Sequence, residues 1–220
     1  MSSSDLETFI QQPLHLDPTT KSILLHPSAP TSSPSTAALT EELDSLNTLH
    51  RTLLTLETPT KTPPPPIPLN PKRSAQITKL RDSANTAYRK STYQEAIKLY
   101  TFALDMALAR PPWEPASLVR EESSGLFANR AQAYMAQRSW AEGLVDAKSS
   151  VECKGVGNVK GWWRAGKCLA EMGRWAEAKE WVEKGLEAEV KSAEAVKELN
   201  GLLEEVKEGL ARESAAAASA

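Results

Sequence analysis

Leucines occupy most of the apolar positions between residues 37 and 57, and they are spaced three or four residues apart. This spacing predicts an amphipathic helix with leucines along one face. The predicted stripe consists of Leu39, Leu43, Leu46, Leu49, Leu53 and Leu56. A single amphipathic helix cannot bury such a stripe alone. We therefore expect it to dock either on the downstream part of the chain or, as the favoured alternative, on another protein.

Prolines interrupt the segments on either side of this helix. Pro13 and Pro18 break the short apolar clusters of residues 9–25, so we expect extended or irregular structure there. Residues 59–71 read PTKTPPPPIPLNP, a composition that favours polyproline II and a semi-rigid spacer. The sequence therefore predicts a partner-docking module at residues 1–58 and a linker at residues 59–73.

Internal self-similarity is the most informative feature of residues 74–212. Three segments each show a helical pattern, a short turn and a second helical pattern. The first helices carry small residues at matching places, namely Ala84, Ala131 and Gly166. The second helices begin with the aromatic residues Tyr93, Trp140 and Trp175. Two further sets of small residues follow in the second helices, namely Ala96, Gly143 and Ala178, then Ala103, Ser150 and Gly185.

These matching places have a packing explanation. Two antiparallel helices approach closely only where side chains are small, and the aromatic residue fills the space beside the turn. Each helix pair leaves an apolar face for the next pair, so the stack shares one continuous core. The pattern resembles the tetratricopeptide repeat (TPR), whose length is about 34 residues. It predicts an all-α fold, a TPR helical solenoid of three repeats.

The intervals between repeats are unequal. Ala84 and Ala131 are 47 positions apart, whereas Ala131 and Gly166 are 35 apart. The first interval exceeds the motif by about 13 residues, and we expect residues 110–124 to form an extended connection. A last amphipathic pattern over about residues 191–212 predicts a helix that caps the solenoid. The TPR domain with its capping helix is thus expected at residues 74–212, followed by a frayed tail at 213–220.

Composition excludes several classes of function. The formal net charge is −2, so nucleic acid is not expected as a partner. The N-terminus, MSSSDLETFI, has neither the basic nor the apolar region of a signal peptide. No apolar run approaches the ~18 residues of a membrane-spanning helix. We therefore expect a cytosolic chain without direct membrane insertion.

The residue types that commonly carry catalysis show no useful spacing. Cys153 and Cys168 form no paired motif and are expected to be buried small apolar residues. His15, His26 and His50 show neither metal-ligand nor triad spacing. We expect no catalytic residue, no metal and no cofactor, and we predict that the protein is not an enzyme.

Candidate binding residues lie on the first helix of each repeat, because these helices line the concave groove of a TPR stack. TPR domains that bind heat-shock chaperones carry a carboxylate clamp of basic residues and asparagines on these helices. The present sequence resembles that clamp at five positions: Arg81, Asn85, Asn129, Lys160 and Arg164. It departs from the family pattern in one detail, because the first basic residue is more often lysine.

The resemblance implies that the groove binds a chaperone tail ending in Glu-Glu-Val-Asp. The last residue of such a tail presents two carboxylates, to which Lys and Arg donate charge-assisted hydrogen bonds. An Asn amide can donate to a carboxylate or to peptide backbone. Specificity among chaperones is expected to depend on neighbouring positions, for which the candidates are Tyr88, Gln132 and Met135. Tyr88 and Met135 are equally compatible with a place in the core.

The whole layout resembles the peripheral TPR subunit of the fungal Sec complex, which serves post-translational translocation into the endoplasmic reticulum. The stretch PLHLDPTTKSILL and the leucine helix after it are similar to the N-terminal module of that subunit. The resemblance implies that residues 1–58 bind an integral membrane subunit of the Sec complex. It also implies that the groove recruits seventy-kilodalton or ninety-kilodalton heat-shock chaperones to the cytosolic face of the membrane.

Two alternatives remain open at this point. One is a soluble TPR co-chaperone that belongs to no membrane complex. The other is a structural scaffold whose groove is filled by its own N-terminus or by a subunit that is not a chaperone.

Overall fold

The computed structural model describes residues 13–27, 35–56, 63 and 71–218. The chain divides into two compact units, Met1–Ile67 and Pro68–Ala220. Within the described residues the first unit contains two strands and one helix, and the second contains seven helices. This architecture confirms the predicted all-α fold class, with a small β-hairpin added near the N-terminus.

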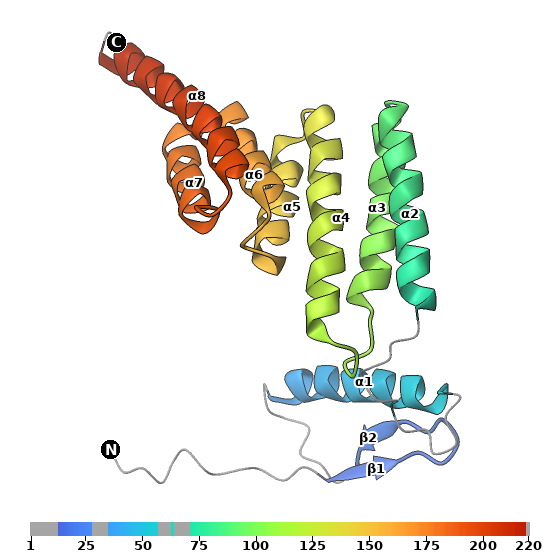
Figure 1. The fold of residues 1–220 in the computed structure, drawn as a ribbon. Coiled ribbons are helices and arrows are strands. Elements are labelled where there is room, and N and C mark those ends of the chain that lie inside the picture. The colour runs from blue at the N-terminus through green and yellow to red at the C-terminus, as the bar shows by residue number, and fades with distance from the viewer. Residues whose placement is uncertain (1–12, 28–34, 57–62, 64–70, 219–220) are drawn as a thin grey trace, which may run out of the picture. The chain divides into compact units, whose positions relative to one another are not determined.

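The N-terminal unit is built from a hairpin and one helix (Figure 1). Strands β1 (Leu14–Leu16) and β2 (Ile23–Leu25) pair antiparallel, with His15 opposite Leu24. In the turn, the Asp17 carboxylate accepts hydrogen bonds from the Thr19 amide at 2.8 Å and the Thr20 hydroxyl at 2.6 Å. The extended structure expected between residues 9 and 25 is therefore a hairpin, although residues 9–12 lie outside the described residues.

Helix α1 (Ser35–Leu54) carries the predicted leucine stripe, but the unit buries it only in part. Leu43 is buried, whereas the side chain of Leu46 is 46% exposed. The other predicted positions, Leu39, Leu49, Leu53 and Leu56, are half-buried. The neighbouring Asn47 is buried as well and binds the backbone of β2. The leucines thus lie along one face of α1, and this face keeps part of its apolar surface exposed.

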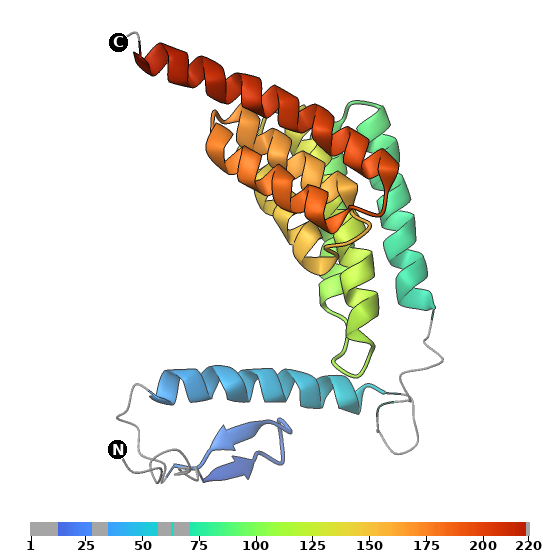
Figure 2. The ribbon, with the colours of Figure 1, turned by 60° about the vertical axis from the view of Figure 1, so that its left-hand side comes forward.

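The second unit is a TPR stack of three helix pairs and one capping helix (Figures 1 and 2). The first pair is α2 (Lys72–Arg89) with α3 (Tyr93–Leu108), and the second is α4 (Ala116–Ala136) with α5 (Trp140–Cys153). The third pair is α6 (Val159–Glu171) with α7 (Trp175–Ala188), and α8 (Ala193–Ala218) follows. Each helix packs on the next, as expected for a solenoid.

Small residues at the predicted matching places allow the helices of this unit to approach closely. Ala84 and Ala131 are completely buried. A Cβ atom added to Gly166 would lie 2.6 Å from Cγ2 of Val182, so no larger residue fits there without movement. The space beside Gly185 is similarly filled by Trp162, whose ring atoms would lie 3.1 Å from an added Cβ. Close helix contact therefore depends on residue size at these positions.

The predicted extended connection at residues 110–124 is wrong, because α4 already begins at Ala116. Most of the additional residues in the first repeat interval form extra turns at the start of this helix. The Arg110 guanidinium holds the extension in place by donating to the Glu122 carboxylate and the Ser74 hydroxyl, each at 2.8 Å. It also pairs with Glu114 in the short connection. A buried ionic network thus holds the start of α4 where an extended connection was expected.

The capping helix is longer than the pattern predicted. It continues through Ala218, so most of the predicted frayed tail is helical. The alanine-rich sequence explains the extension, because alanine has the highest helix propensity. Leu199 and Val206 of α8 are completely buried and belong to the same apolar cluster as Leu169 and Val182.

One buried asparagine connects several helices of the second unit. The Asn158 side-chain amide donates to the Ser150 carbonyl at 3.0 Å and to the Ser124 hydroxyl at 3.3 Å. Its carbonyl accepts from the Gly161 amide and caps α6, while its own backbone N–H donates to the buried Glu189. Residues 154–158 therefore form the connection to α6, and the Asn158 cap sets where that helix begins.

Replacing Asn158 with alanine should lower the free energy of unfolding by about 2–4 kcal/mol. The variant loses a helix cap, worth about 1 kcal/mol, and leaves buried polar groups of Ser124 and Ser150 with fewer partners. Urea denaturation followed by circular dichroism measures the loss. Asn200→Ala is the matched control, because Asn200 is exposed on α8 and should change stability by less than about 0.5 kcal/mol. Equal losses in both variants would contradict the role given to Asn158.

Candidate peptide-binding groove

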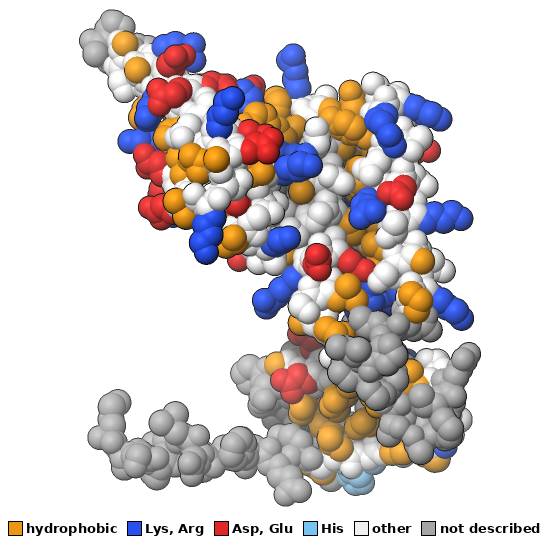
Figure 3. All heavy atoms as spheres, viewed as in Figure 1, with side chains coloured by type: hydrophobic (Ala, Val, Ile, Leu, Met, Phe, Trp, Pro, Cys, Tyr) orange, Lys and Arg blue, Asp and Glu red, His pale blue; other side chains and the backbone are white. Residues whose placement is uncertain are grey.

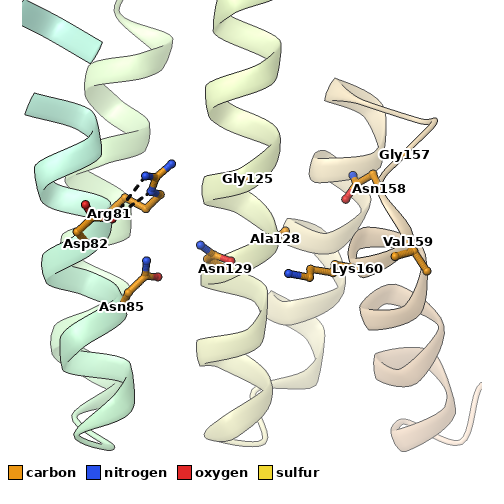
Figure 4. A pocket seen from close by; sticks show the side chains of 10 residues that line it. All are labelled: Arg81, Asp82, Asn85, Gly125, Ala128, Asn129, Gly157, Asn158, Val159 and Lys160. Carbon is orange, nitrogen blue, oxygen red and sulfur yellow. Dashed lines mark hydrogen bonds and ion pairs between the residues drawn. The ribbon is translucent and has the colours of Figure 1, made fainter. Parts of the chain in front are cut away.

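The first helices of the three repeats enclose a cavity of about 500 Å³ (Figure 4). Its lining includes four of the five predicted clamp residues, Arg81, Asn85, Asn129 and Lys160. The other lining residues are Asp82, Gly125, Ala128, Gly157, Asn158 and Val159. Residues far apart in the sequence are thus brought together by stacking α2, α4 and α6.

Local helix geometry places each of these side chains. Arg81 and Asn85 are one turn apart on α2, and therefore lie on one face. Figure 4 shows Asn85 and Asn129 on the facing sides of α2 and α4, and Lys160 extending from the first turn of α6. The amide groups at the start of α6 add a partial positive charge near Lys160.

The charge of the groove is predominantly positive. Arg81 and Lys160 are both exposed at its surface. The one acidic residue in the lining is Asp82, whose carboxylate lies 3.4 Å from Nε of Arg81. Because both members of this pair are exposed, the pair contributes little and is easily exchanged for another anion. The groove is suited to an anionic ligand.

A buried tyrosine orients Asn85. The Tyr100 hydroxyl donates a hydrogen bond of 2.6 Å to Oδ1 of Asn85, which leaves the amide N–H groups of Asn85 to donate elsewhere. Burial raises the pKa of Tyr100, so the hydroxyl keeps its proton. The sequence patterns did not indicate this residue, because Tyr100 lies on α3 and no local spacing connects it with Asn85.

Arg164 differs from the other four predicted clamp residues, because it lies behind the groove and not in its lining. Its side chain donates to the Ala128 carbonyl at 2.7 Å and to the Gln132 amide oxygen, and the residue is only 8% exposed. Among the described residues no carboxylate forms an ion pair with it. Burial lowers the pKa of Arg164. The protein thus holds a desolvated guanidinium without a counter-ion beside the groove.

A second cavity of about 330 Å³ shares Asn85 and Asn129 with the first. Its remaining lining residues are Tyr88, Arg89, Tyr100 and Gln132. Two of the three predicted specificity positions, Tyr88 and Gln132, therefore border the continuation of the groove. Met135 packs instead against the apolar cluster that contains Cys168. Cys168 is itself completely buried, which raises its pKa to about 12.

Fold and groove together define a TPR protein with a cationic peptide-sized groove. No family model matches the chain. The chain is 38% identical over 143 residues to the ER protein translocation subcomplex subunit sec67 of Schizosaccharomyces pombe. The match covers 64% of this chain and 74% of that subunit. The chain therefore belongs to the family of this translocation subunit, as its sequence resemblance predicted.

Solved structures agree with this membership at the level of fold. A chain in the cryo-EM structure of the Saccharomyces cerevisiae Sec complex has a TM-score of 0.68 and 23% identity, with 91% of this chain and 98% of that one covered. The first TPR of Spaghetti (RPAP3), bound to the HSP90 peptide SRMEEVD, has a TM-score of 0.50 and 24% identity. That match covers 63% of this chain and 95% of the RPAP3 domain. Within the described residues, no helix is long and apolar enough to cross a membrane.

Replacing Arg164 with methionine should leave the TPR unit as stable as the unaltered protein or more stable. Methionine keeps an apolar stem and removes a buried charge that lacks an acidic partner, and holding such a charge out of water costs several kcal/mol. Chemical denaturation followed by circular dichroism gives the change in the free energy of unfolding.

Arg130→Met is the matched control for this variant. Arg130 donates to the buried Asp146 carboxylate at 2.7 and 2.8 Å, and these hydrogen bonds raise the pKa of Arg130. Its loss would leave Asp146 buried without a partner, so stability should fall by about 3–5 kcal/mol. Similar losses in both variants would show that Arg164 is a structural link between α4 and α6.

Proposed function

We propose that the protein is a non-enzymatic docking receptor of the endoplasmic reticulum translocation machinery. Its TPR groove binds the Glu-Glu-Val-Asp tail of a cytosolic heat-shock chaperone. The proposed chaperone belongs to the seventy-kilodalton class. The N-terminal unit attaches the receptor to an integral membrane subunit of the Sec complex. The chaperone and its cargo are thereby held at the cytosolic face of the membrane.

The observation that carries this proposal is the convergence of Arg81, Asn85, Asn129 and Lys160 on one cavity. Two cations and two amides there offer donors to the paired carboxylates at the end of an acidic tail. Hydrogen bonds to charged groups contribute about 1.5–3 kcal/mol each. Ordering a flexible tail offsets part of that gain. We therefore expect a dissociation constant in the micromolar range, which corresponds to a binding free energy of about −8 kcal/mol.

Arg164 supports the same ligand from behind the groove. A desolvated cation without an acidic partner is costly by itself, and an arriving anion would lower that cost. The similar RPAP3 domain is a complex with an HSP90 peptide that ends in the same four residues, Glu-Glu-Val-Asp. The similarity to the RPAP3 domain supports the fold. The ligand proposed for the present groove is inferred from the residues that line the groove.

Attachment to the translocation machinery is supported by how much of this chain the similar chain of the yeast Sec complex covers. The similar chain in the yeast Sec complex covers 91% of this chain, which extends beyond the TPR unit. The RPAP3 domain covers only 63%. This extent of coverage supports a role for the N-terminal unit in attachment, and its partly exposed leucine stripe offers an apolar surface for a partner subunit.

Calorimetric titration with a peptide ending in Glu-Glu-Val-Asp tests the groove. The unaltered protein should bind with a dissociation constant of about 1–100 µM, and binding should weaken as salt is added. Lys160→Ala and Asn129→Ala should each weaken binding about ten-fold or more, because each removes a donor to the tail.

Two controls make this titration specific. Lys184→Ala removes an exposed lysine on α7 and should bind normally. A peptide with an amidated C-terminus lacks one carboxylate and should bind at least about ten-fold more weakly, a loss of about 1.4 kcal/mol. Equal binding of both peptides, or no effect of either groove variant, would leave the structural scaffold as the better description. Tail binding without recovery of a Sec-complex subunit on residues 1–58 would favour the soluble co-chaperone.

Tyr100→Phe should weaken tail binding by about 0.5–1.5 kcal/mol, or roughly three- to ten-fold. Without the tyrosine hydroxyl, the Asn85 amide loses the partner that orients it. Tyr134→Phe is the matched control, because Tyr134 is half-buried and lines neither cavity. An unchanged dissociation constant for Tyr100→Phe would show that Asn85 needs no orienting partner.

A further inference from the structure

The two-stranded sheet of the N-terminal unit has two outer edges, and α1 occupies one of them. The Ile23 amide donates to Oδ1 of Asn47 at 2.6 Å, and Nδ2 of Asn47 donates to the Ile23 carbonyl at 3.0 Å. One buried side-chain amide thus pairs with β2 as a neighbouring strand would. Among the described residues, the backbone of α1 approaches that of β2 and not that of β1.

The hairpin register shows which backbone groups of β1 face outward. The His26 amide donates to the Pro13 carbonyl and the Asp17 amide to the Ser22 carbonyl, each at 2.9 Å. Because bonded pairs alternate along an antiparallel ladder, the backbone of the intervening Leu14 and Leu16 points away from β2. No described residue hydrogen-bonds to those outward groups. Within the described residues, the outer edge of β1 is therefore open.

Apolar side chains accompany this open edge. Leu14 and Leu16 share one face of the sheet and are 47% and 55% exposed. An open edge with exposed leucines is a template for pairing with another strand, and proteins normally cover such edges. Figure 3 shows hydrophobic side chains gathered on the visible face of this unit.

The described residues of this unit also bury few side chains. Among its described residues only Leu43 and Asn47 are fully buried. A two-stranded hairpin is only marginally stable in water and gains independent stability from a third strand or a packed helix. A third strand on β1 would satisfy the open backbone groups and cover Leu14 and Leu16 together.

We propose that the outer edge of β1 is a docking site for an extended apolar segment of another subunit of the translocation complex. The segment pairs its backbone with Leu14 and Leu16 and places apolar side chains at alternate positions beside them. An extended chain fits because its backbone donors and acceptors are free, whereas those within a helix are already paired. This inference rests on the proposed attachment of the N-terminal unit to the complex, and it specifies strand pairing as the mode of that attachment.

A proline substitution tests the strand pairing without disturbing the hairpin. Leu16→Pro removes one outward N–H, and proline is tolerated on an edge strand where that group faces away from the neighbour. Leu16→Val is the matched control, because it keeps the N–H and an apolar side chain. The probe is the translocation complex purified from the host's microsomes without this subunit, and binding to the full-length chain is measured in detergent.

The unaltered chain and Leu16→Val should bind within two-fold of one another, and Leu16→Pro at least ten-fold more weakly. Binding should also slow hydrogen exchange of the Leu14 and Leu16 amides in the unaltered chain. Affinity for the chaperone tail should be the same in all three proteins, which shows that the TPR unit is unaffected. Hydrogen exchange of the His26 amide, which donates to the Pro13 carbonyl across the hairpin, should also be the same in the three free proteins and shows that Leu16→Pro keeps the hairpin.

Each other outcome has a definite meaning. Normal binding of Leu16→Pro, or unprotected Leu14 and Leu16 amides in the complex, would overturn the strand pairing and leave the docking receptor intact. Failure of the unaltered chain to bind the complex would overturn both proposals. A chain that self-associates through this edge, and becomes monomeric as Leu16→Pro, would identify a second copy as the occupant and overturn the inference.

Discussion

The groove of the TPR unit depends on close approach of paired helices at small side chains. Ala84 and Ala131 are completely buried, and Gly166 lies against Val182 with no space for a Cβ atom. These contacts set the stacking of successive pairs, and hence the placement of α2, α4 and α6 beside one cavity. A larger residue at one of them would shift a whole helix, and with it a polar side chain of the groove.

Buried polar groups then fix details that apolar packing leaves free. Asn158 sets the start of α6, and Tyr100 orients the Asn85 amide. Two arginines on neighbouring helices, the half-buried Arg130 and the buried Arg164, have different kinds of partner. Arg130 is neutralised by Asp146, whereas Arg164 has only neutral acceptors among the described residues. A desolvated charge that lowers stability is expected where a protein reserves it for an anionic ligand.

The two units differ in how many of their described side chains are buried. The TPR unit buries two apolar clusters, one around α2 and α3 and one across α5 to α8, and α4 contributes residues to both. Among its described residues, the N-terminal unit buries few side chains, and the outward backbone groups of β1 have no hydrogen-bond partner there.

The sequence by itself determined the helix–turn–helix repeat and the helix faces on which four of the five candidate groove residues lie. These features depend on residue size and on a period of 3.6, both of which are local. Tertiary structure decided the depth of Arg164, the contact of Tyr100 with Asn85, the helical start of α4 and the role of Asn47 at a strand edge. Each of these depends on partners many positions away, so spacing along one helix could not reveal them.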